Sequence, residues 1–297
     1  MELLGIDVGG TKVALRVEGG AGVREETFRW PAAGSASEDL TLLAARAEAL
    51  LATRPAPVAA VGVAMPALCD ASGVVTTWPG RPTWAGLDLA AALRAIFGAT
   101  PVALADDGDL AALAEARAAD CPDVLYLGVG TGIGGGIVLD GRLWPGRPGS
   151  SCEVGHVVVG LAGPRCDCGR AGCVQAYASG PATLRRAARM RGREVPFAEL
   201  AEAAGAGTPW ALDVLRESAA ALTAVATGVS ELVQPALMVL GGGFAEGMPS
   251  LAGLVAEELE RASRAGRPAL PVRGAVLGGL SSLHGALLLA RERAIPA

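Results

Sequence analysis

The chain has 297 residues, of which 51% are apolar and 19% are charged, and its formal net charge is −5. This composition is typical of a globular chain with a large core and excludes a disordered protein. The length exceeds what one ordinary core requires, so it favours two packed lobes. The acidic balance argues against nucleic acid as a partner, because phosphate backbones are bound by basic faces.

Neither the amino terminus nor the most apolar segment carries an export or membrane signal. The start MELLGIDVGG has no basic region and no small-residue cleavage site. The most apolar stretch, at 274–290, is interrupted by Ser281, Ser282 and His284, the last of which we interpret as a packed core residue. We therefore expect a cytoplasmic protein that does not contact the membrane.

The first part of the chain reads as alternating strands and helices. Apolar periodicity and turn residues predict strands at 3–8, 13–18, 58–66 and 102–105, helices at 40–52, 89–97 and 108–119, and a loop at 70–88.

The opening pattern then recurs. An apolar strand at 124–129, a glycine turn at 130–136 and a strand at 137–140 repeat the strand, turn and strand of 3–18, about 120 residues later. This recurrence predicts a duplicated two-lobe α/β architecture. Further helices are predicted at 181–191, 197–204, 209–233 and 283–293, with a strand at 236–240.

Three glycine turns follow three of the apolar strands, at 9–12, 130–136 and 241–243. Successive backbone N–H groups in such turns form a concave anion site, and the missing Cβ atoms let a phosphate approach. The alternative is that they are only tight turns, but their places at the carboxyl ends of buried strands favour phosphate. The second turn is followed by a strand, so it is not a dinucleotide fingerprint, which opens a helix.

Five motifs in this order resemble the ROK family of bacterial glucokinases, N-acetylhexosamine kinases and sugar-responsive repressors. They are DVGGTK at 7–12, GVGTGIGGGIVLDGRL at 128–143, EVGHVVV at 153–159, CDCGRAGCVQAYASG at 166–180 and LGGG at 240–243. The resemblance implies an actin-like, hexokinase-type duplicated fold that binds ATP and sugar in an interlobe cleft, and a homodimer or homotetramer. We expect a small lobe at 1–107, with the helix at about 283–297 packing back on it, and a large lobe at 108–282.

His156, Cys166, Cys168 and Cys173 form a candidate metal site. Their side chains are the kinds of ligand that tetrahedral Zn²⁺ takes, and four protein ligands indicate a structural ion. The alternative, a group of buried free thiols, is disfavoured because CDCGRAGC is polar and turn-like. The zinc would hold Glu153, His156 and Gln175 against the sugar.

Asp107 is the candidate catalytic residue. Phosphoryl transfer needs a carboxylate that accepts the proton of the attacking hydroxyl, and the resemblance places Asp107 on the catalytic aspartate of the family. An aspartate between a strand and a helix is also an ordinary helix cap, which is the competing interpretation. Asp7 would reach Mg²⁺ through water. The candidate contacts to ATP are Asp7, Gly9, Gly10, Thr11, Lys12, Thr131, Gly132, Gly242 and Gly243.

Three positions depart from the family pattern. Where the family has an asparagine that contacts sugar hydroxyls, this chain has Asp106. Where the family has a glutamate that contacts the anomeric end of the sugar, this chain has Gln175, and Ala67 stands in place of a family glycine. A negative group beside Asp107 is costly unless a cation lies there, and a 3-ammonium group would supply one. We therefore expect a kinase for the 6-hydroxyl of 3-amino-3-deoxyglucose (kanosamine). The alternatives are that Asp106 accepts bonds from two neutral hydroxyls or is protonated.

Other functions stay open. A glucokinase or an N-acetylhexosamine kinase would use the same chemistry on another hexose. A sugar-sensing repressor of the family would carry a winged helix before the first strand, which begins at Leu3 here. A non-catalytic sugar-binding protein would be expected to lack Asp107 or a glycine turn.

Overall fold

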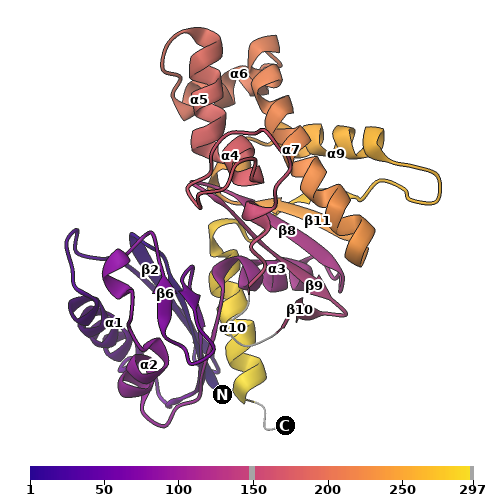
Figure 1. The fold of residues 1–297 in the computed structure, drawn as a ribbon. Helices are drawn as coiled ribbons and strands as arrows, with labels where there is room; N and C mark the ends of the chain where they lie inside the picture. The colour runs from indigo at the N-terminus through magenta and orange to yellow at the C-terminus, as the bar shows by residue number, and fades with distance from the viewer. Residues whose placement is uncertain (147–150, 295–297) are drawn as a thin grey trace. The chain divides into compact units, whose positions relative to one another are not determined.

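A computed structural model describes residues 1–146 and 151–294 (Figure 1). The chain divides into two compact units, which are described separately. Unit 1 comprises the described parts of Met1–Ala114, Pro145–Ser151 and Leu280–Ala297, and unit 2 comprises Glu115–Trp144 and Cys152–Gly279.

Unit 1 is built on a five-stranded sheet of order β3-β2-β1-β4-β7. Strand β1 runs antiparallel to β2 and parallel to β4. The elements of this unit are β1 (Glu2–Val8), β2 (Lys12–Gly19), β3 (Gly22–Arg29), α1 (Ala36–Leu51), β4 (Val58–Ala64), β5 (Leu68–Cys69), β6 (Val75–Thr77), the 3-10 helix η1 (Pro82–Trp84), α2 (Leu89–Phe97), β7 (Val102–Ala105), the first part of α3 (Asp107–Ala118) and α10 (Ser281–Ala294).

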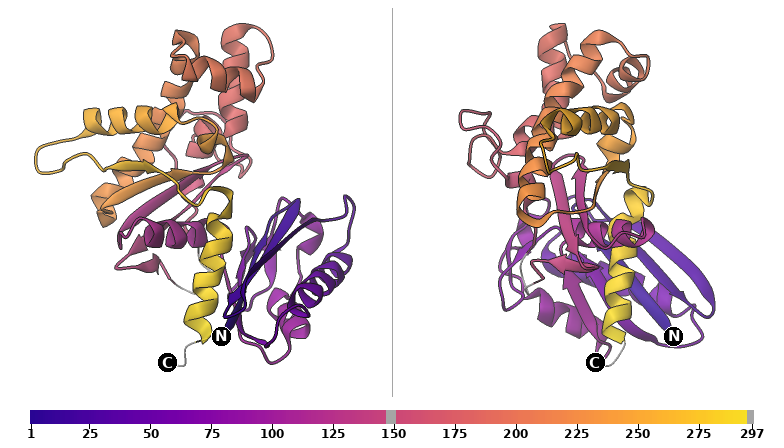
Figure 2. Two further views of the ribbon diagram at one scale, coloured as in Figure 1. Left: turned by 180° about the vertical axis from the view of Figure 1, so that it is seen from behind. Right: turned by 90° about the vertical axis from the view of Figure 1, so that its right-hand side faces the viewer.

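Helices cover both faces of this sheet, with α1 and α2 on one face and α10 on the other (Figures 1 and 2). Side chains alternate between the two faces of a strand. Leu4 and Ile6 of β1 accordingly join a core with Leu43 of α1, whereas Leu3 packs with Leu287 of α10. The central strands β1 and β4 are therefore buried on both faces.

Close contact with α10 requires small residues in the sheet. A Cβ atom at Gly62 of β4 would lie 1.8 Å from the carbonyl oxygen of Ala286, and one at Gly5 would lie 2.8 Å from Leu287. The start of α3 packs equally closely on α10, because a Cβ atom at Gly285 would lie 2.0 Å from the carbonyl oxygen of Leu110. These glycines thus fix α10 on the sheet and α3 on α10, and α3 carries the candidate carboxylates at its amino terminus.

Unit 2 repeats the same plan with a sheet of order β10-β9-β8-β11-β12, in which β8 is antiparallel to β9 and parallel to β11. The duplication predicted from the two glycine hairpins is thus present in the strand order of the two sheets. The elements of unit 2 are the second part of α3, β8 (Val124–Val129), β9 (Ile133–Leu139), β10 (Arg142–Trp144), η2 (Val154–His156), α4 (Val174–Ala178), α5 (Gly180–Arg191), α6 (Phe197–Gly205), α7 (Pro209–Val233), β11 (Leu237–Gly241), α8 (Gly243–Glu246), α9 (Ser250–Ala262) and β12 (Val272–Gly274), after which η3 (Gly278–Leu280) leads back to unit 1.

The core of unit 2 lies between its sheet and the long helix α7. Leu125 and Leu127 of β8 are fully buried in one cluster with Leu215 and Leu222 of α7. Helix α7 begins at Pro209, where a missing N–H costs nothing, and it ends before Gln234, which has φ 53°. Within the described residues, no helix combines the length and the apolar character that crossing a membrane requires.

Candidate active site

The first glycine turn connects β1 to β2 and is held in place by tryptophan. The N–H of Gly9 donates to the carbonyl of Lys12 (2.9 Å), and the indole N–H of Trp30 donates to the carbonyl of Gly9 (2.8 Å). A Cβ atom at Gly10 would lie 3.1 Å from the Cα atom of Gly80. Thr11 and Lys12 are exposed beside this turn. The backbone here is therefore tightly fixed, as an anion-binding turn requires.

Asp106 is the amino-terminal cap of α3. Its Oδ1 atom accepts the backbone N–H groups of Gly108 (3.0 Å) and Asp109 (3.3 Å), and its carbonyl accepts that of Leu110. Asp106 thereby satisfies two of the N–H groups that have no partner within the first turn of the helix. The structure thus supports the helix-cap interpretation for Asp106 and leaves Asp107 as the first helical residue.

Asp7 and Asp107 lie near each other at the ends of β1 and β7. Burial, reinforced by the negative charge of Asp107 and opposed by Lys12, raises the pKa of Asp7 from 3.8 to about 7. Two carboxylates in a partly buried place are the oxygen donors that Mg²⁺ prefers, and a divalent cation would relieve their repulsion. The residues present therefore fit a magnesium site.

Asp7→Asn is expected to make the metal-free protein more stable at high pH. The raised pKa of Asp7 means that the folded state holds its proton up to about pH 7, whereas the unfolded chain loses it near pH 4. The free energy of unfolding consequently falls as the pH rises through this window, by at most about 4 kcal/mol. The stability advantage of Asp7→Asn over the wild type should grow by about 2–3 kcal/mol between pH 5 and pH 8.

The measurement is urea unfolding at both pH values without Mg²⁺ or nucleotide, with exposed Asp140→Asn as the control. An advantage of Asp7→Asn that is the same at pH 5 and pH 8 would contradict a buried, proton-binding carboxyl at this position.

The second and third glycine turns lie together in unit 2. The second turn is shorter than predicted, because β9 already begins at Ile133: it comprises residues 130–132 and closes with the N–H of Gly130 donating to the carbonyl of Gly132 (2.9 Å). In the third turn Gly242 has φ 85°, and a Cβ atom there would lie 2.6 Å from the backbone of Val129, the last residue of β8. Thr131 is exposed at the tip of the second turn, and the position of a Cβ atom on Gly243 is open. The third turn therefore lies directly against the residue that precedes the second turn.

The four predicted zinc ligands converge. One ligand atom from each of His156, Cys166, Cys168 and Cys173 lies within 4.8 Å of all the others. Tetrahedral zinc with ordinary bond lengths places two sulfur atoms about 3.8 Å apart and sulfur and nitrogen about 3.6 Å apart. The Sγ atoms of Cys168 and Cys173 are 3.6 Å apart, and Cys166 Sγ lies 3.6 Å from His156 Nδ1. The cluster therefore fits a four-coordinate structural zinc ion.

Local backbone structure brings these ligands together. His156 ends the single turn η2, and Cys173 immediately precedes α4. Between them, the N–H of Cys166 donates to the carbonyl of Arg170 and the N–H of Gly169 (φ 90°) donates to the carbonyl of Cys166, which closes a tight turn. Without metal, burial raises the pKa of Cys173 to about 12, whereas a hydrogen bond with the backbone of Arg170 lowers the pKa of Cys168.

The remaining predicted sugar contacts, Glu153 and Gln175, lie on either side of this cluster in the sequence. Glu153 is exposed directly before η2. Gln175 is partly buried on α4, and its Oε1 atom accepts the backbone N–H of Ile133 at 3.0 Å. Sequence reasoning did not find this bond, since its partner is 42 residues away and nothing in the local pattern indicates it.

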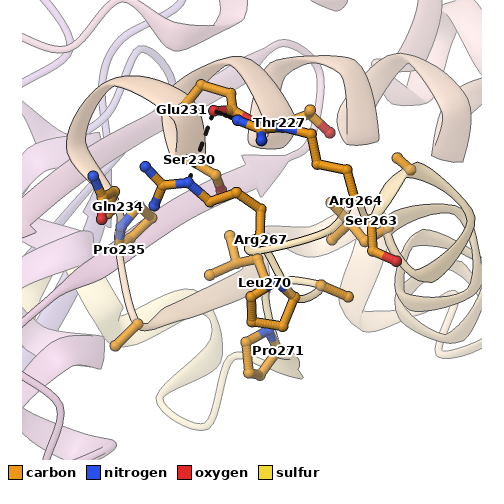
Figure 3. A pocket seen from close by; sticks show the side chains of 15 residues that line it. Thr227, Ser230, Glu231, Gln234, Pro235, Ser263, Arg264, Arg267, Leu270 and Pro271 are labelled. Atoms are coloured by element: carbon orange, nitrogen blue, oxygen red, sulfur yellow. Dashed lines mark hydrogen bonds and ion pairs between the residues drawn. The ribbon is translucent and has the colours of Figure 1, made fainter.

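A surface cavity of about 250 Å³ in unit 2 is separate from these residues (Figure 3). It lies at the end of α7 and along 263–271, where the carboxylate of Glu231 binds Arg264 through two hydrogen bonds and faces Arg267. None of the predicted site residues lines it. Because Glu231 already compensates part of the arginine charge, the cavity is not a strong anion site.

Comparison with known proteins decides the family. The sequence profile of the ROK family matches residues 3–293. The chain belongs to the ROK family. This confirms the resemblance found in the motifs at 7–12, 128–143 and 166–180.

Several ROK relatives are similar over almost the whole chain. A kanosamine kinase from Amycolatopsis mediterranei is 54% identical over 97% of this chain and 95% of that protein. The crystal structure of a ROK hexokinase from Thermus thermophilus has a TM-score of 0.87 at 32% identity, covering 98% of both chains. A ROK glucokinase from Streptomyces griseus, in complex with glucose and AMPPNP, has a TM-score of 0.79 at 30% identity, covering 98% of this chain and 100% of that one. The predicted hexokinase-type α/β fold is therefore confirmed.

Proposed function

We propose that this ROK chain transfers the γ-phosphoryl group of ATP to the 6-hydroxyl of a glucose-type sugar, and that 3-amino-3-deoxyglucose (kanosamine) is its favoured substrate. The observation that carries this proposal is the 54% identity, over nearly the whole chain, to the kanosamine kinase of Amycolatopsis mediterranei. The glucokinase from Streptomyces griseus is only 30% identical, so the similarity favours the amino sugar over glucose.

Asp107 acts as the general base in the proposed reaction. Its carboxylate takes the proton of the 6-hydroxyl while the hydroxyl oxygen bonds to the γ-phosphorus and the bond from that phosphorus to ADP breaks. The position of Asp107 at the start of α3, near Asp7, supports this role. Mg²⁺, held near Asp7, would supply positive charge that neutralises the phosphoryl oxygens.

The other site residues bind the two substrates. Gly10, Gly132, Gly242 and Gly243 are the candidate backbone donors to phosphate, because the N–H groups of Gly9 and Gly130 already donate to the carbonyls of Lys12 and Gly132. Asp106, Glu153, His156 and Gln175 contact the sugar. His156 binds zinc through Nδ1, the ring nitrogen that faces Cys166, and this leaves Nε2 for a sugar hydroxyl.

Structural zinc, a homodimer or homotetramer and a cytoplasmic location complete the proposal. The ligand distances support the zinc ion. The oligomeric state and the location are predictions from the family resemblance and the sequence.

ADP release from ATP and Mg²⁺ tests the function directly. Glucose, mannose, glucosamine, N-acetylglucosamine, N-acetylmannosamine and 3-amino-3-deoxyglucose are offered in parallel to the purified protein. We expect the 3-amino sugar to have the highest kcat/KM, by about tenfold or more, which is about 1.4 kcal/mol in the transition state. If glucose is preferred, the chain is a glucokinase with an aspartate in its sugar site, and ADP release with none of them rejects the kinase proposal.

Asp106→Asn is expected to reduce the preference for the amino sugar. Asparagine caps a helix as well as aspartate does, so the bonds to Gly108 and Asp109 survive while the negative charge is removed. A charge-assisted hydrogen bond is roughly twice as strong as a neutral one, so the kcat/KM ratio of 3-amino-3-deoxyglucose to glucose should fall about tenfold. A variant that keeps the wild-type ratio shows that the charge of Asp106 does not select the substrate.

A further inference from the structure

The residue that follows the second glycine turn contacts both segments that carry zinc ligands. The backbone N–H of Ile133 donates to Oε1 of Gln175, two residues after the zinc ligand Cys173. On its other side, a Cβ atom at Gly155 would lie only 1.9 Å from the carbonyl oxygen of Ile133. Gly155 immediately precedes the zinc ligand His156. Both ends of the zinc loop, which we define as residues 155–175, therefore contact Ile133, the first residue of β9.

The turn itself is held by the same part of unit 2. The carbonyl of Gly130 accepts the N–H of Gly180 (2.9 Å), which begins α5 directly after α4. A Cβ atom at Gly132 would lie 2.8 Å from Oε1 of Gln175. Residues 130–133 are thus fixed at both ends by α4 and α5.

Buried bonds in turn hold α4. Arg186 of α5 is buried and donates to the carbonyl of Tyr177 (3.0 Å) in α4 and to the carbonyl of Val214 (3.0 Å) in α7. The phenol oxygen of Tyr177 packs against the zinc loop, because a Cβ atom at Gly163 would lie 2.2 Å from it. Helix α4 therefore joins the metal cluster, the core of unit 2 and the glycine turn.

We propose that Gln175 is a positioning residue that fixes the glycine turn 130–132 to the metal cluster, so that nucleotide binding depends on its amide oxygen. This inference rests on the proposed function, in which the turn binds the phosphates of ATP. Only the oxygen of the Gln175 amide can accept the N–H of Ile133, so the bond sets the orientation of the side chain. A turn that is already ordered loses less entropy when the nucleotide binds.

Two replacements of Gln175 separate the hydrogen bond from the volume of the side chain. Gln175→Glu keeps an acceptor oxygen, whereas Gln175→Leu has a similar size and none. We expect Gln175→Leu to weaken Mg²⁺–AMPPNP binding about tenfold, because the N–H of Ile133 loses its partner. Gln175→Glu should stay within about threefold of the wild-type Kd. The measurement is calorimetric titration of the full chain without sugar, with zinc content checked by elemental analysis.

The outcomes separate this inference from the proposed function. If Gln175→Leu keeps the wild-type nucleotide Kd and its zinc, or if Gln175→Glu is as weak as Gln175→Leu, the positioning role is rejected and the kinase proposal stands. If the wild type binds no nucleotide and phosphorylates no sugar, both proposals are rejected.

A double-mutant cycle with Gly132→Ala supplies an independent test. The added methyl group would displace the Gln175 amide, and so it should weaken nucleotide binding in the wild type but have little further effect in Gln175→Ala. Gly134→Ala is the matched control, since a Cβ atom there meets nothing within 4 Å. Equal effects of Gly132→Ala in both backgrounds would mean that the methyl group acts on the nucleotide directly, which overturns the inference.

Discussion

Asp107→Asn is expected to lower kcat about 10²–10⁴-fold while changing the KM values of sugar and ATP only slightly. Asparagine has nearly the same shape as aspartate but cannot accept the proton of the attacking hydroxyl. The residue lies at the first position of α3, and the cap of this helix is Asp106, so the substitution leaves the capping bonds in place. The loss should therefore fall on the chemical step, which single-turnover ADP release measures.

The control for this variant is Asp120→Asn. Asp120 is exposed in the loop after α3 and has φ 50°, a conformation that asparagine tolerates well. It should have wild-type kcat and KM. If Asp107→Asn keeps a substantial kcat, another residue is the general base and Asp107 has only a structural role at the start of α3.

The elements with strong apolar patterns could be predicted from the sequence almost to the residue. The helices at 89–97 and 209–233 and the strand at 102–105 are found with the predicted bounds. In each case an apolar period and a turn or proline signal agree. The duplicated strand order followed from the repeated glycine hairpin, because both copies keep the same apolar strand before the turn.

Some elements were missed, and most of these lack such patterns. Strand β3 is an exposed edge strand with the sequence GVREETFR, and its charges hide its pairing with β2. The three residues of β12 pair with β11 but are too short to show a period. Helix α9 was missed although Leu251, Leu254, Val255 and Leu259 follow the helical period and are buried. For α9 the signal was present in the sequence.

The residues of the candidate site also differ in how clearly the sequence indicates them. The convergence of His156, Cys166, Cys168 and Cys173 could be predicted because their spacing is local and their residue types are rare in this chain. The role of Asp106 as a cap could be suspected from the strand-to-helix position, but choosing it among three aspartates required the bond to Gly108. The bond from Ile133 to Gln175 depends on tertiary packing, and no local pattern indicates it.

Cys168→Ser is expected to abolish stoichiometric zinc binding and most of the kinase activity without disrupting the packing of the hydrophobic core. Cys168 is the exposed ligand of the cluster, whereas Cys166 and Cys173 are buried, so its replacement separates the loss of metal from the loss of packing. Even the loss of an outer partner of a metal ligand costs about 10–100-fold in metal affinity, and the loss of a ligand should cost more. Zinc content should fall from about one ion per chain to a small fraction.

The loss of activity should follow from the geometry of the loop, since a four-ligand structural site has no open position for catalysis. Hydrogen exchange should accordingly increase in 152–178 and at the turn 130–133, and remain at the wild-type level in β1 and β4 of unit 1. Cys121→Ser is the matched control, because Cys121 lies outside the cluster and its Sγ atom donates to the carbonyl of Asp123. A zinc-free Cys168→Ser protein with full kcat/KM would show that the metal does not position the sugar contacts Glu153 and His156.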